Sequence, residues 1–498
     1  MSKKFNIIFT VLCTFCLVSC SVAGGDWYYN AANSDGYYEY YDEETGETYS
    51  AIDETGFVDA DLVSSSYLSL STSTYAYTNV RRYITEYSSG YTYIPKDAIV
   101  IEEMINYFDY DFVNNTNEAL ASVLEINKCP WNEDTYLALV GLKAKEVVAD
   151  ERPNNYVFLV DVSGSMNSES KLGMFKKAFG YLADTLDDND RISIVTYASG
   201  VKVIANGVKG SDRSKLLDKV NKLSASGSTY GEAGIQRAYE VAYENFINNG
   251  NNRIFITTDG DFNVGINNTD DLTNFISEKR NEGIYLSVIG VGSGNTRHDM
   301  MEKLAKCGDG NAYYMDSEEE AKRIFQDKFG ALVNTVAKDT KAKITFNPSV
   351  VDMYRVIGYE NNSLTEDEYE SEYTDAGEIS LGFSTIALYE LKLNEEFTLD
   401  NVLSLEVKYL DVDKNENIIL NSELTTLCNS SNDFLFASCV AELGLLLRQS
   451  AYMGDASFEN LITRLNTCNL GDDEYKLEFK ELVGLASEMD MFQDVYLD

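Results

Sequence analysis

Between residues 155 and 336, short apolar runs alternate with amphipathic segments, and this alternation limits the fold more than any other feature. YVFLV, RISIVTYA, RIFITT and IYLSVIGVG have the length of buried strands, and helical patterns such as KLGMFKKAFGYLADTL separate them. Continuous apolar strands separated by helices are typical of a mainly parallel sheet that is covered on both faces. We therefore predict an α/β domain at residues 151–337.

The regions on either side of this domain show different patterns. Residues 67–150 contain two helical segments and two strand-like runs, residues 338–432 are rich in strands, and residues 433–498 have helical periodicity. Both flanks look β-rich and neither is large by itself. We predict that the strands around 137–148 and 341–420 form one β layer into which the α/β domain is inserted.

The first nineteen residues have the pattern of a signal peptide. Lys3 and Lys4 precede an apolar run that is too short for an ordinary membrane-spanning helix. The LVSC sequence that follows resembles the lipobox of bacterial lipoproteins, which implies cleavage before Cys20 and a lipid on that cysteine. The chain would then be a membrane-anchored, extracytoplasmic protein of a bacterial cell envelope. The alternative is a plain secretory signal with an unrelated cysteine.

Residues 20–66 are rich in Tyr, Asp, Glu, Gly and Ser, and the part after Cys20 contains neither lysine nor arginine. This composition predicts an extended, solvated tether, although the tyrosines could instead bind a ligand such as cell-wall glycan. The whole chain has 40 Lys+Arg against 81 Asp+Glu, a formal charge of −41. Such a charge repels phosphate backbones, so we expect no nucleic-acid partner.

Oxygen-bearing side chains follow three segments of the predicted sheet. Asp161, Ser163 and Ser165 come directly after YVFLV, Thr229 lies just before a helix, and Asp259 ends the RIFITT strand. In an open parallel sheet, ligands bind at the carboxyl ends of the strands. Carboxylates and hydroxyls suit a hard divalent cation, and two carboxylates neutralise its charge. The competing interpretation is helix capping, which does not require Thr229 and Asp259 on neighbouring strand ends.

The Asp-x-Ser-x-Ser pattern with Thr229 and Asp259 resembles the metal-ion-dependent adhesion site of von Willebrand factor type A domains. The resemblance implies a Rossmann-like domain that binds Mg²⁺, with Mn²⁺ or Ca²⁺ as alternatives. It also implies a protein partner that supplies an Asp or Glu carboxylate to the metal. Further blocks, including IEEMINYFDYDF, YRVIGYE and VAELGLLLRQS, look like those of bacterial YfbK-like lipoproteins, over roughly residues 67–486.

Two other functions remain open for this chain. One is a structural envelope scaffold with a vestigial metal site, and the other is a Mg²⁺-dependent hydrolase. No general base or nucleophile is identifiable beside the predicted metal, so we expect a binding protein and no enzyme. His298 is the only histidine and is predicted to be solvated at the start of a polar helix.

Two further patterns have simple interpretations. The DVDKNEN stretch at residues 411–417 lacks the glycine of a calcium-binding EF-hand loop, so we predict a polar hairpin turn there. The sparse cysteines after Cys20 are expected to be buried free thiols, although Cys428, Cys439 and Cys468 are near enough in sequence for one disulfide.

Overall fold

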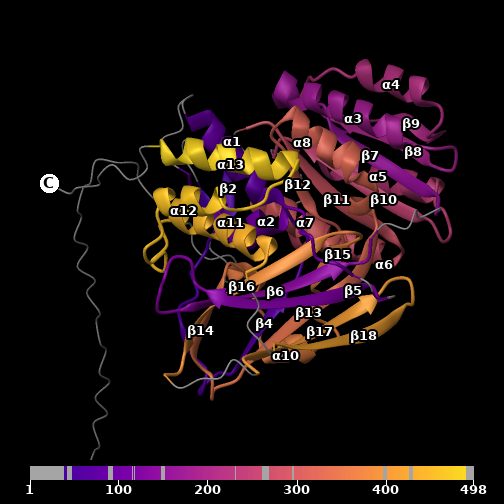
Figure 1. Cartoon of the computed structure of the whole chain (residues 1–498). Helices are drawn as coiled ribbons and strands as arrows, with labels where there is room; N and C mark the ends of the chain where they lie inside the picture. The colour runs from indigo at the N-terminus through magenta and orange to yellow at the C-terminus, as the bar shows by residue number, and fades with distance from the viewer. Residues whose placement is uncertain are drawn as a thin grey trace, which may run out of the picture.

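The computed structural model describes residues 39–41, 47–87, 94–114, 116, 118–146, 152–229, 231–260, 269–293, 297–395, 401–424 and 430–489. These residues form an α/β domain beside a pair of β-sheets, with a helical layer next to both (Figure 1). The predicted signal peptide, Cys20 and Cys428 lie outside the described residues. Within the described residues, no helix combines the length and apolar character needed to cross a bilayer.

The α/β domain contains a six-stranded sheet in the order β12-β11-β10-β7-β8-β9. All neighbouring strands are parallel except β9, which pairs antiparallel with β8 at the edge. This confirms the predicted mainly parallel sheet. The strands are β7 (Asn154–Asp161), β8 (Arg191–Tyr197), β9 (Val201–Lys209), β10 (Asn251–Thr258), β11 (Ile284–Val291) and β12 (Ala312–Met315).

Helices cover both faces of this sheet because alternate strand residues point to opposite sides. Phe158 packs with the helices of one face, while Val157 and Leu159 pack with those of the other. The first face carries α3 (Met174–Thr185), α4 (Arg213–Asn221), α8 (Glu318–Lys322), η5 (Arg323–Asp327) and α9 (Phe329–Val333). The second carries α5 (Gly231–Glu244), α6 (Thr269–Asn281) and α7 (His298–Cys307).

The flanking strands form two sheets that pack face to face around a shared apolar core. One sheet has the order β15-β13-β17-β18, and β4 also pairs with β13. Its strands are β4 (Ser65–Ser69), β13 (Thr335–Phe346), β15 (Gly377–Ser380), β17 (Leu403–Asp411) and β18 (Glu416–Leu424). The other, in order, consists of β3 (Val58–Asp59), β14 (Val351–Ile357), β16 (Ser384–Leu393), β6 (Tyr136–Ala144) and β5 (Leu120–Lys128).

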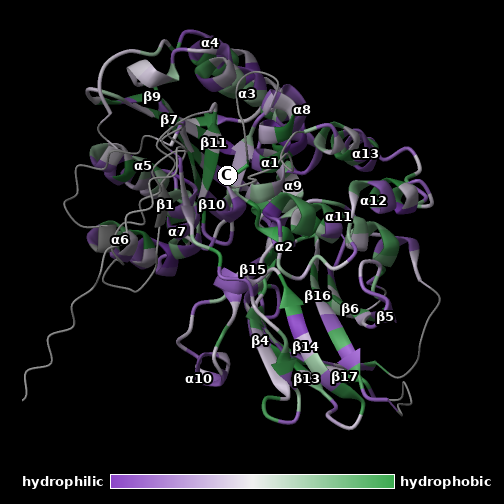
Figure 2. Ribbon diagram, turned by 90° about the vertical axis from the view of Figure 1, so that its left-hand side faces the viewer, coloured by the Kyte–Doolittle hydropathy of each residue, from purple (hydrophilic) through white to green (hydrophobic). Residues whose placement is uncertain are grey.

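A helical layer covers the outer face of the sheet that contains β6. Leu137 and Leu139 of β6 pack against these helices, while Ala138 and Val140 face the second sheet. The helices are α1 (Tyr75–Glu86), α2 (Ile101–Asn106), α11 (Asn432–Arg448), α12 (Phe458–Leu465) and α13 (Glu474–Ser487). The peripheral helices α12 and α13 carry both hydrophilic and hydrophobic residues, as expected for helices with one buried side (Figure 2).

Short elements complete the described fold. They are β1 (Glu39–Tyr41), β2 (Thr48–Ser50), η2 (Lys96–Ala98), η3 (Gly164–Met166), η4 (Glu169–Gly173), η6 (Glu360–Asn362) and α10 (Glu366–Glu370). The DVDKNEN stretch joins β17 to β18 as a hairpin, which confirms the predicted turn. Asp411 Oδ1 accepts hydrogen bonds from the backbone N–H groups of Asp413 and Lys414 at 3.1 Å each.

The predicted single β layer is wrong in one respect. Strands from both flanks do pair, since β6 and β16 are antiparallel neighbours, and the α/β domain is inserted between them. However, the strands divide into two sheets instead of one. The alternation in β6 explains this difference, because both of its faces are apolar and each needs its own covering layer.

The predicted tether is also wrong for residues 47–66. This segment contains β2 and β3, reaches into β4, and buries Tyr49 and Ala60 within the folded body. Glu47 is buried as well, and its Oε2 accepts from the Tyr49 hydroxyl at 2.6 Å and from Arg82 Nη2 at 2.8 Å. Arg82, which is buried on α1, therefore neutralises Glu47, although the composition of this segment predicts that Glu47 is exposed to solvent.

Candidate metal centre

Asp161 lies at the carboxyl end of β7, in the middle of the six-stranded sheet. Its side chain is fully buried, and Oδ1 accepts a hydrogen bond from Ser163 N at 2.7 Å. Burial raises the pKa of Asp161 to about 6, although the hydrogen bonds from Ser163 oppose this shift. The negative charge of Asp259 also contributes to the increase. The carboxylates of Asp161 and Asp259 therefore lie close enough for their negative charges to repel each other.

Asp259 follows directly after β10, the strand beside β7. The parallel register pairs Thr257 with Val160, which places Asp259 beyond the strand end and next to the loop after Asp161. Asp259 is buried, and its Oδ1 has no hydrogen-bond partner among the described residues. Gly260 has φ of +94° and allows the chain to turn away at once. Asp261, which the sequence indicates is a turn residue and not a ligand, lies outside the described residues.

The two serines lie in the loop that leaves β7. Ser163 is buried, Ser165 is exposed, and their Oγ atoms are 3.0 Å apart. The short turn η3 begins between them at Gly164, and the Ser163 hydroxyl lies close enough to the Asp161 carboxylate to lower its pKa. The structure therefore brings together Asp161, Ser163, Ser165 and Asp259 at one edge of the sheet.

Thr229 comes from a different loop, immediately before α5. Two residues earlier, Gly227 O accepts a hydrogen bond from Gly164 N at 2.9 Å, which holds this loop beside the serine loop. Gly227 has φ of +90°, and a Cβ there would lie 2.3 Å from Ser199 Oγ, so the position favours glycine. Thr229 is partly exposed. The backbone places it near the site, and its hydroxyl forms no hydrogen bond with Asp161 in the structure.

Lys171 also belongs to this site, although no sequence pattern marks it. It lies in the turn η4, and its Nζ donates to Asp259 Oδ2 at 2.9 Å. The aliphatic part of Lys171 lies against Gly292, where a Cβ would come within 2.4 Å of Lys171 Cγ. Lys171 follows Ser165 by only six residues, but its partner Asp259 is 88 residues away in sequence.

The donor set fits a hard divalent cation. The carboxylates of Asp161 and Asp259 are both buried. Asp259 Oδ1 has no hydrogen-bond partner among the described residues, whereas the Asp161 carboxylate has the Tyr197 hydroxyl beside it. Burying two neighbouring carboxylates, one of them with an unpaired oxygen, is unfavourable, and a bound cation would compensate both charges. The serine hydroxyls would add neutral oxygen ligands of the kind that Mg²⁺ and Ca²⁺ accept.

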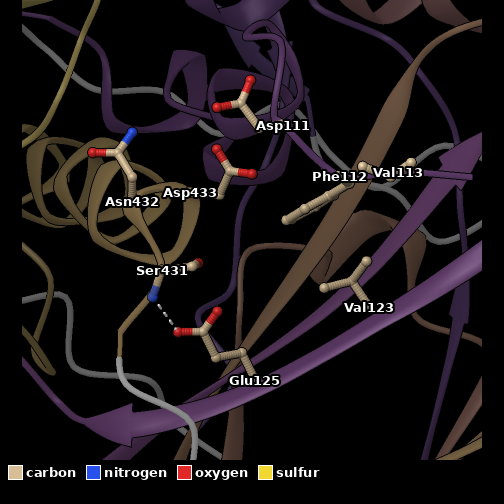
Figure 3. A pocket seen from close by; sticks show the side chains of 8 residues that line it. All are labelled: Asp111, Phe112, Val113, Val123, Glu125, Ser431, Asn432 and Asp433. Atoms are coloured by element: carbon tan, nitrogen blue, oxygen red, sulfur yellow. Dashed lines mark hydrogen bonds between the residues drawn. The ribbon is translucent and has the colours of Figure 1, made fainter.

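A surface pocket lies elsewhere, between the β5 strand and the start of α11. It is lined by Asp111, Phe112, Val113, Val123, Glu125, Ser431, Asn432 and Asp433. Figure 3 shows the Asp111 and Asp433 carboxylates on the same side of this pocket and the hydrogen bond from Ser431 N to Glu125 Oε1 at 2.7 Å. None of the predicted ligands lines this pocket.

The prediction that His298 is solvated is wrong. His298 is only 3% exposed, and its ring lies against Tyr75 with centroids 4.1 Å apart. Burial lowers the pKa of His298. The polar sequence of α7 gives no indication that aromatic side chains of α1 and β2 cover its first turn.

Comparison with known families defines the class of protein. The von Willebrand factor type A domain model matches residues 155–327, which contain the six-stranded sheet and most of its helices. A von Willebrand factor model matches residues 43–139, and the model of the C-terminal region of YfbK matches residues 331–427 and 392–489. Von Willebrand factor type A domains mediate protein–protein interactions, and many bind a divalent metal.

The chain belongs to the YfbK family. It is 33% identical to the uncharacterized protein YfbK of Escherichia coli K12 over 447 residues, which cover 84% of this chain and 77% of that protein. It is also 21% identical to the uncharacterized protein sll0103 of Synechocystis over 292 residues, 57% of this chain and 68% of that protein.

The solved structures to which the chain is similar include a von Willebrand factor type A protein from Catenulispora acidiphila. It shares 15% identity, with a TM-score of 0.40, and the match covers 67% of this chain and 82% of that chain. The ArnB paralog VWA2 from Sulfolobus acidocaldarius shares 14% identity, with a TM-score of 0.34, over 75% of this chain and 97% of that chain.

Proposed function

We propose that this chain is a binding protein of the bacterial cell envelope, held on the membrane by a lipid on Cys20. Asp161, Ser163, Ser165, Thr229 and Asp259 would hold Mg²⁺, or Mn²⁺ or Ca²⁺ in its place, as a metal-ion-dependent adhesion site. The metal would bind an Asp or Glu carboxylate from a protein partner. The observation that carries this proposal is the pair of adjacent buried carboxylates, of which Asp259 has an oxygen without a hydrogen-bond partner among the described residues.

Lys171 supports a carboxylate as the partner's ligand. Asp161, Asp259 and a partner carboxylate bring three negative charges, while a divalent cation and the Lys171 ammonium bring three positive charges. The loaded complex would therefore be neutral, which avoids the penalty of an unbalanced charge at a partly buried site. Before the partner arrives, the lysine and the metal together exceed the charge of the two aspartates by one, so the site attracts an anion.

Lys171→Met is expected to separate metal binding from partner binding. It removes a positive charge beside Asp259 while keeping most of the apolar stem that lies against Gly292. Mg²⁺ affinity should rise roughly three- to tenfold, because the cation no longer meets a like charge. Capture of a carboxylate partner should weaken. Calorimetry with MgCl₂ and capture assays on the same samples would measure the two effects.

A different response to Lys171→Met would favour the alternative function, a structural envelope scaffold with a vestigial metal site. If Lys171 acts only as a permanent structural substitute for the metal, Lys171→Met should lower the melting temperature without improving Mg²⁺ binding. In that case the ion pair with Asp259 maintains the loop, and the site need not bind a metal.

The partner-binding role can be tested by capture from native envelope extracts. Wild-type protein in Mg²⁺ should retain a partner that EDTA releases, and Thr229→Ala should fail to retain it. Ser168→Ala is a matched control, because Ser168 is exposed in the same loop region as the proposed ligands but is not one of them. Capture by Thr229→Ala, or by wild-type protein in EDTA, that equals capture by wild-type protein in Mg²⁺ would contradict a metal-mediated contact.

A further inference from the structure

A second group of metal-ligand side chains joins α2 to α7. Glu103 comes from α2, whereas His298 and Glu302 lie one turn apart on α7. One ligand atom from each residue lies within 4.8 Å of the other two. Glu103 is almost two hundred positions away from His298 in sequence, and the three residues meet where the N-terminal helices contact the α/β domain.

The histidine in this group has a nitrogen without a hydrogen bond. His298 is almost completely buried, and its Nε2 has no hydrogen-bond partner among the described residues. The nearest acidic atom is Glu302 Oε1, at 3.5 Å from Nε2. A buried polar atom without a partner is unfavourable by about 1–3 kcal/mol, so native proteins generally provide it with a partner.

The two glutamates supply the remaining features of a metal site. Glu103 is buried, and its Oε2 accepts a hydrogen bond from Ala76 N at 2.8 Å, which fixes the orientation of the carboxylate. Glu302 has a side chain that is 36% exposed, so an ion can reach the group from solvent on that side. Together the two carboxylates match the charge of one divalent cation.

We propose that Glu103, His298 and Glu302 form a second metal site, which takes Zn²⁺ or a similar first-row transition ion and fastens α2 to α7. An imidazole ligand favours such ions over Mg²⁺ and Ca²⁺. In a tetrahedral zinc site with bonds of about 2.0–2.1 Å, neighbouring ligand atoms are about 3.3 Å apart. The pair formed by Nε2 and Glu302 Oε1 already lies near that separation, and a water could fill the fourth position.

The site is separate from the predicted cation site in both ligands and chemistry. It contains a nitrogen ligand, and no residue is shared between the two sites. The competing explanation is that Glu103 and Glu302 share a proton. Burial, followed by the charge of Glu302, raises the pKa of Glu103 to about 8, which is compatible with a shared proton when no metal is bound.

Cobalt titration distinguishes these two explanations. The full folded chain carrying Asp161→Ala, which disables the first site, would be stripped of metal with EDTA, dialysed and titrated with Co²⁺. We expect one equivalent of Co²⁺ to give the intense visible bands of a four- or five-coordinate ion. His298→Gln and Glu302→Gln should each weaken this binding at least tenfold, while Glu278→Gln, on an exposed position of α6, should leave it unchanged.

A thermal readout keeps the test informative if a variant is less stable. Excess Zn²⁺ should raise the melting temperature of the Asp161→Ala protein by several degrees and leave that of its Glu302→Gln derivative unchanged. Binding of Co²⁺ that is identical with and without His298→Gln and Glu302→Gln would overturn the proposal. So would the absence of both the visible bands and the Zn²⁺ shift in the Asp161→Ala protein, which would identify a proton-sharing pair.

Discussion

Arg81→Met should lower the free energy of unfolding by about 3–5 kcal/mol, because it removes the counter-charge of the buried Asp316 carboxylate and one of the two that Glu320 has. Arg81 is buried on α1 and pairs with Asp316 at 2.6 Å and Glu320 at 3.0 Å, both in the α/β domain. It also reaches Glu478 on α13 at 2.8 Å. One side chain therefore connects three parts of the chain that are distant in sequence.

Thermal and urea unfolding, followed by circular dichroism, would measure this loss. Arg237→Met is the matched control, because Arg237 forms its ion pairs on the exposed surface of α5 and should have little effect. Combining Arg81→Met with Asp316→Asn should cost less than the sum of the two single changes, since the second removes a charge that the first leaves unpaired. Similar stability of the Arg81 and Arg237 variants would show that α1 is not held in this way.

Asp161→Asn should reduce Mg²⁺ affinity at least 100-fold. The asparagine can still accept the hydrogen bond from Ser163 N, so the loop is preserved while one of the two metal-binding charges is lost. In the metal-free protein, the same change removes repulsion between Asp161 and Asp259 and should therefore raise the melting temperature. We therefore expect Asp161→Asn to lower the affinity for Mg²⁺ and to raise the stability of the metal-free protein.

Calorimetry with MgCl₂ after EDTA treatment and dialysis would give the affinity. Asp184→Asn is a suitable control, because Asp184 is an exposed aspartate on α3, far along the helix from the predicted ligands. Unchanged Mg²⁺ binding in Asp161→Asn would remove the basis for the proposed adhesion site. A fall in metal-free stability would instead indicate that the charge of Asp161 supports the fold.

The sequence predicted the α/β domain well because local periodicity and strand length carry that information. The runs YVFLV and RIFITT became β7 and β10, and their parallel pairing placed Asp161 and Asp259 at the same sheet edge. Long-range pairing was harder to predict. The two faces of β6 are both apolar, and the pattern alone could not show that one face meets a second sheet while the other meets helices.

Residues that act through distant partners were not recognisable from sequence. Lys171 has no local feature that indicates contact with Asp259, and His298 looked solvated because its covering residues, such as Tyr75, are more than two hundred positions away. For residues 47–66 the composition led to a wrong prediction, because a segment rich in acidic residues and tyrosines is typical of a solvated tether. There, Glu47 is neutralised by Arg82, and the ring of Tyr49 contributes to a core.

Anomalous diffraction from crystals soaked in Mn²⁺ would test the central claim most directly, because it locates the ion and its ligands together. At the carboxyl edge of β7 we predict a peak with Ser163 Oγ, Ser165 Oγ and Thr229 Oγ1 around it and with Asp161 and Asp259 bound directly or through water. A map with no peak between Asp161 and Asp259, or with Thr229 turned away from an ion found there, would contradict the proposed metal centre.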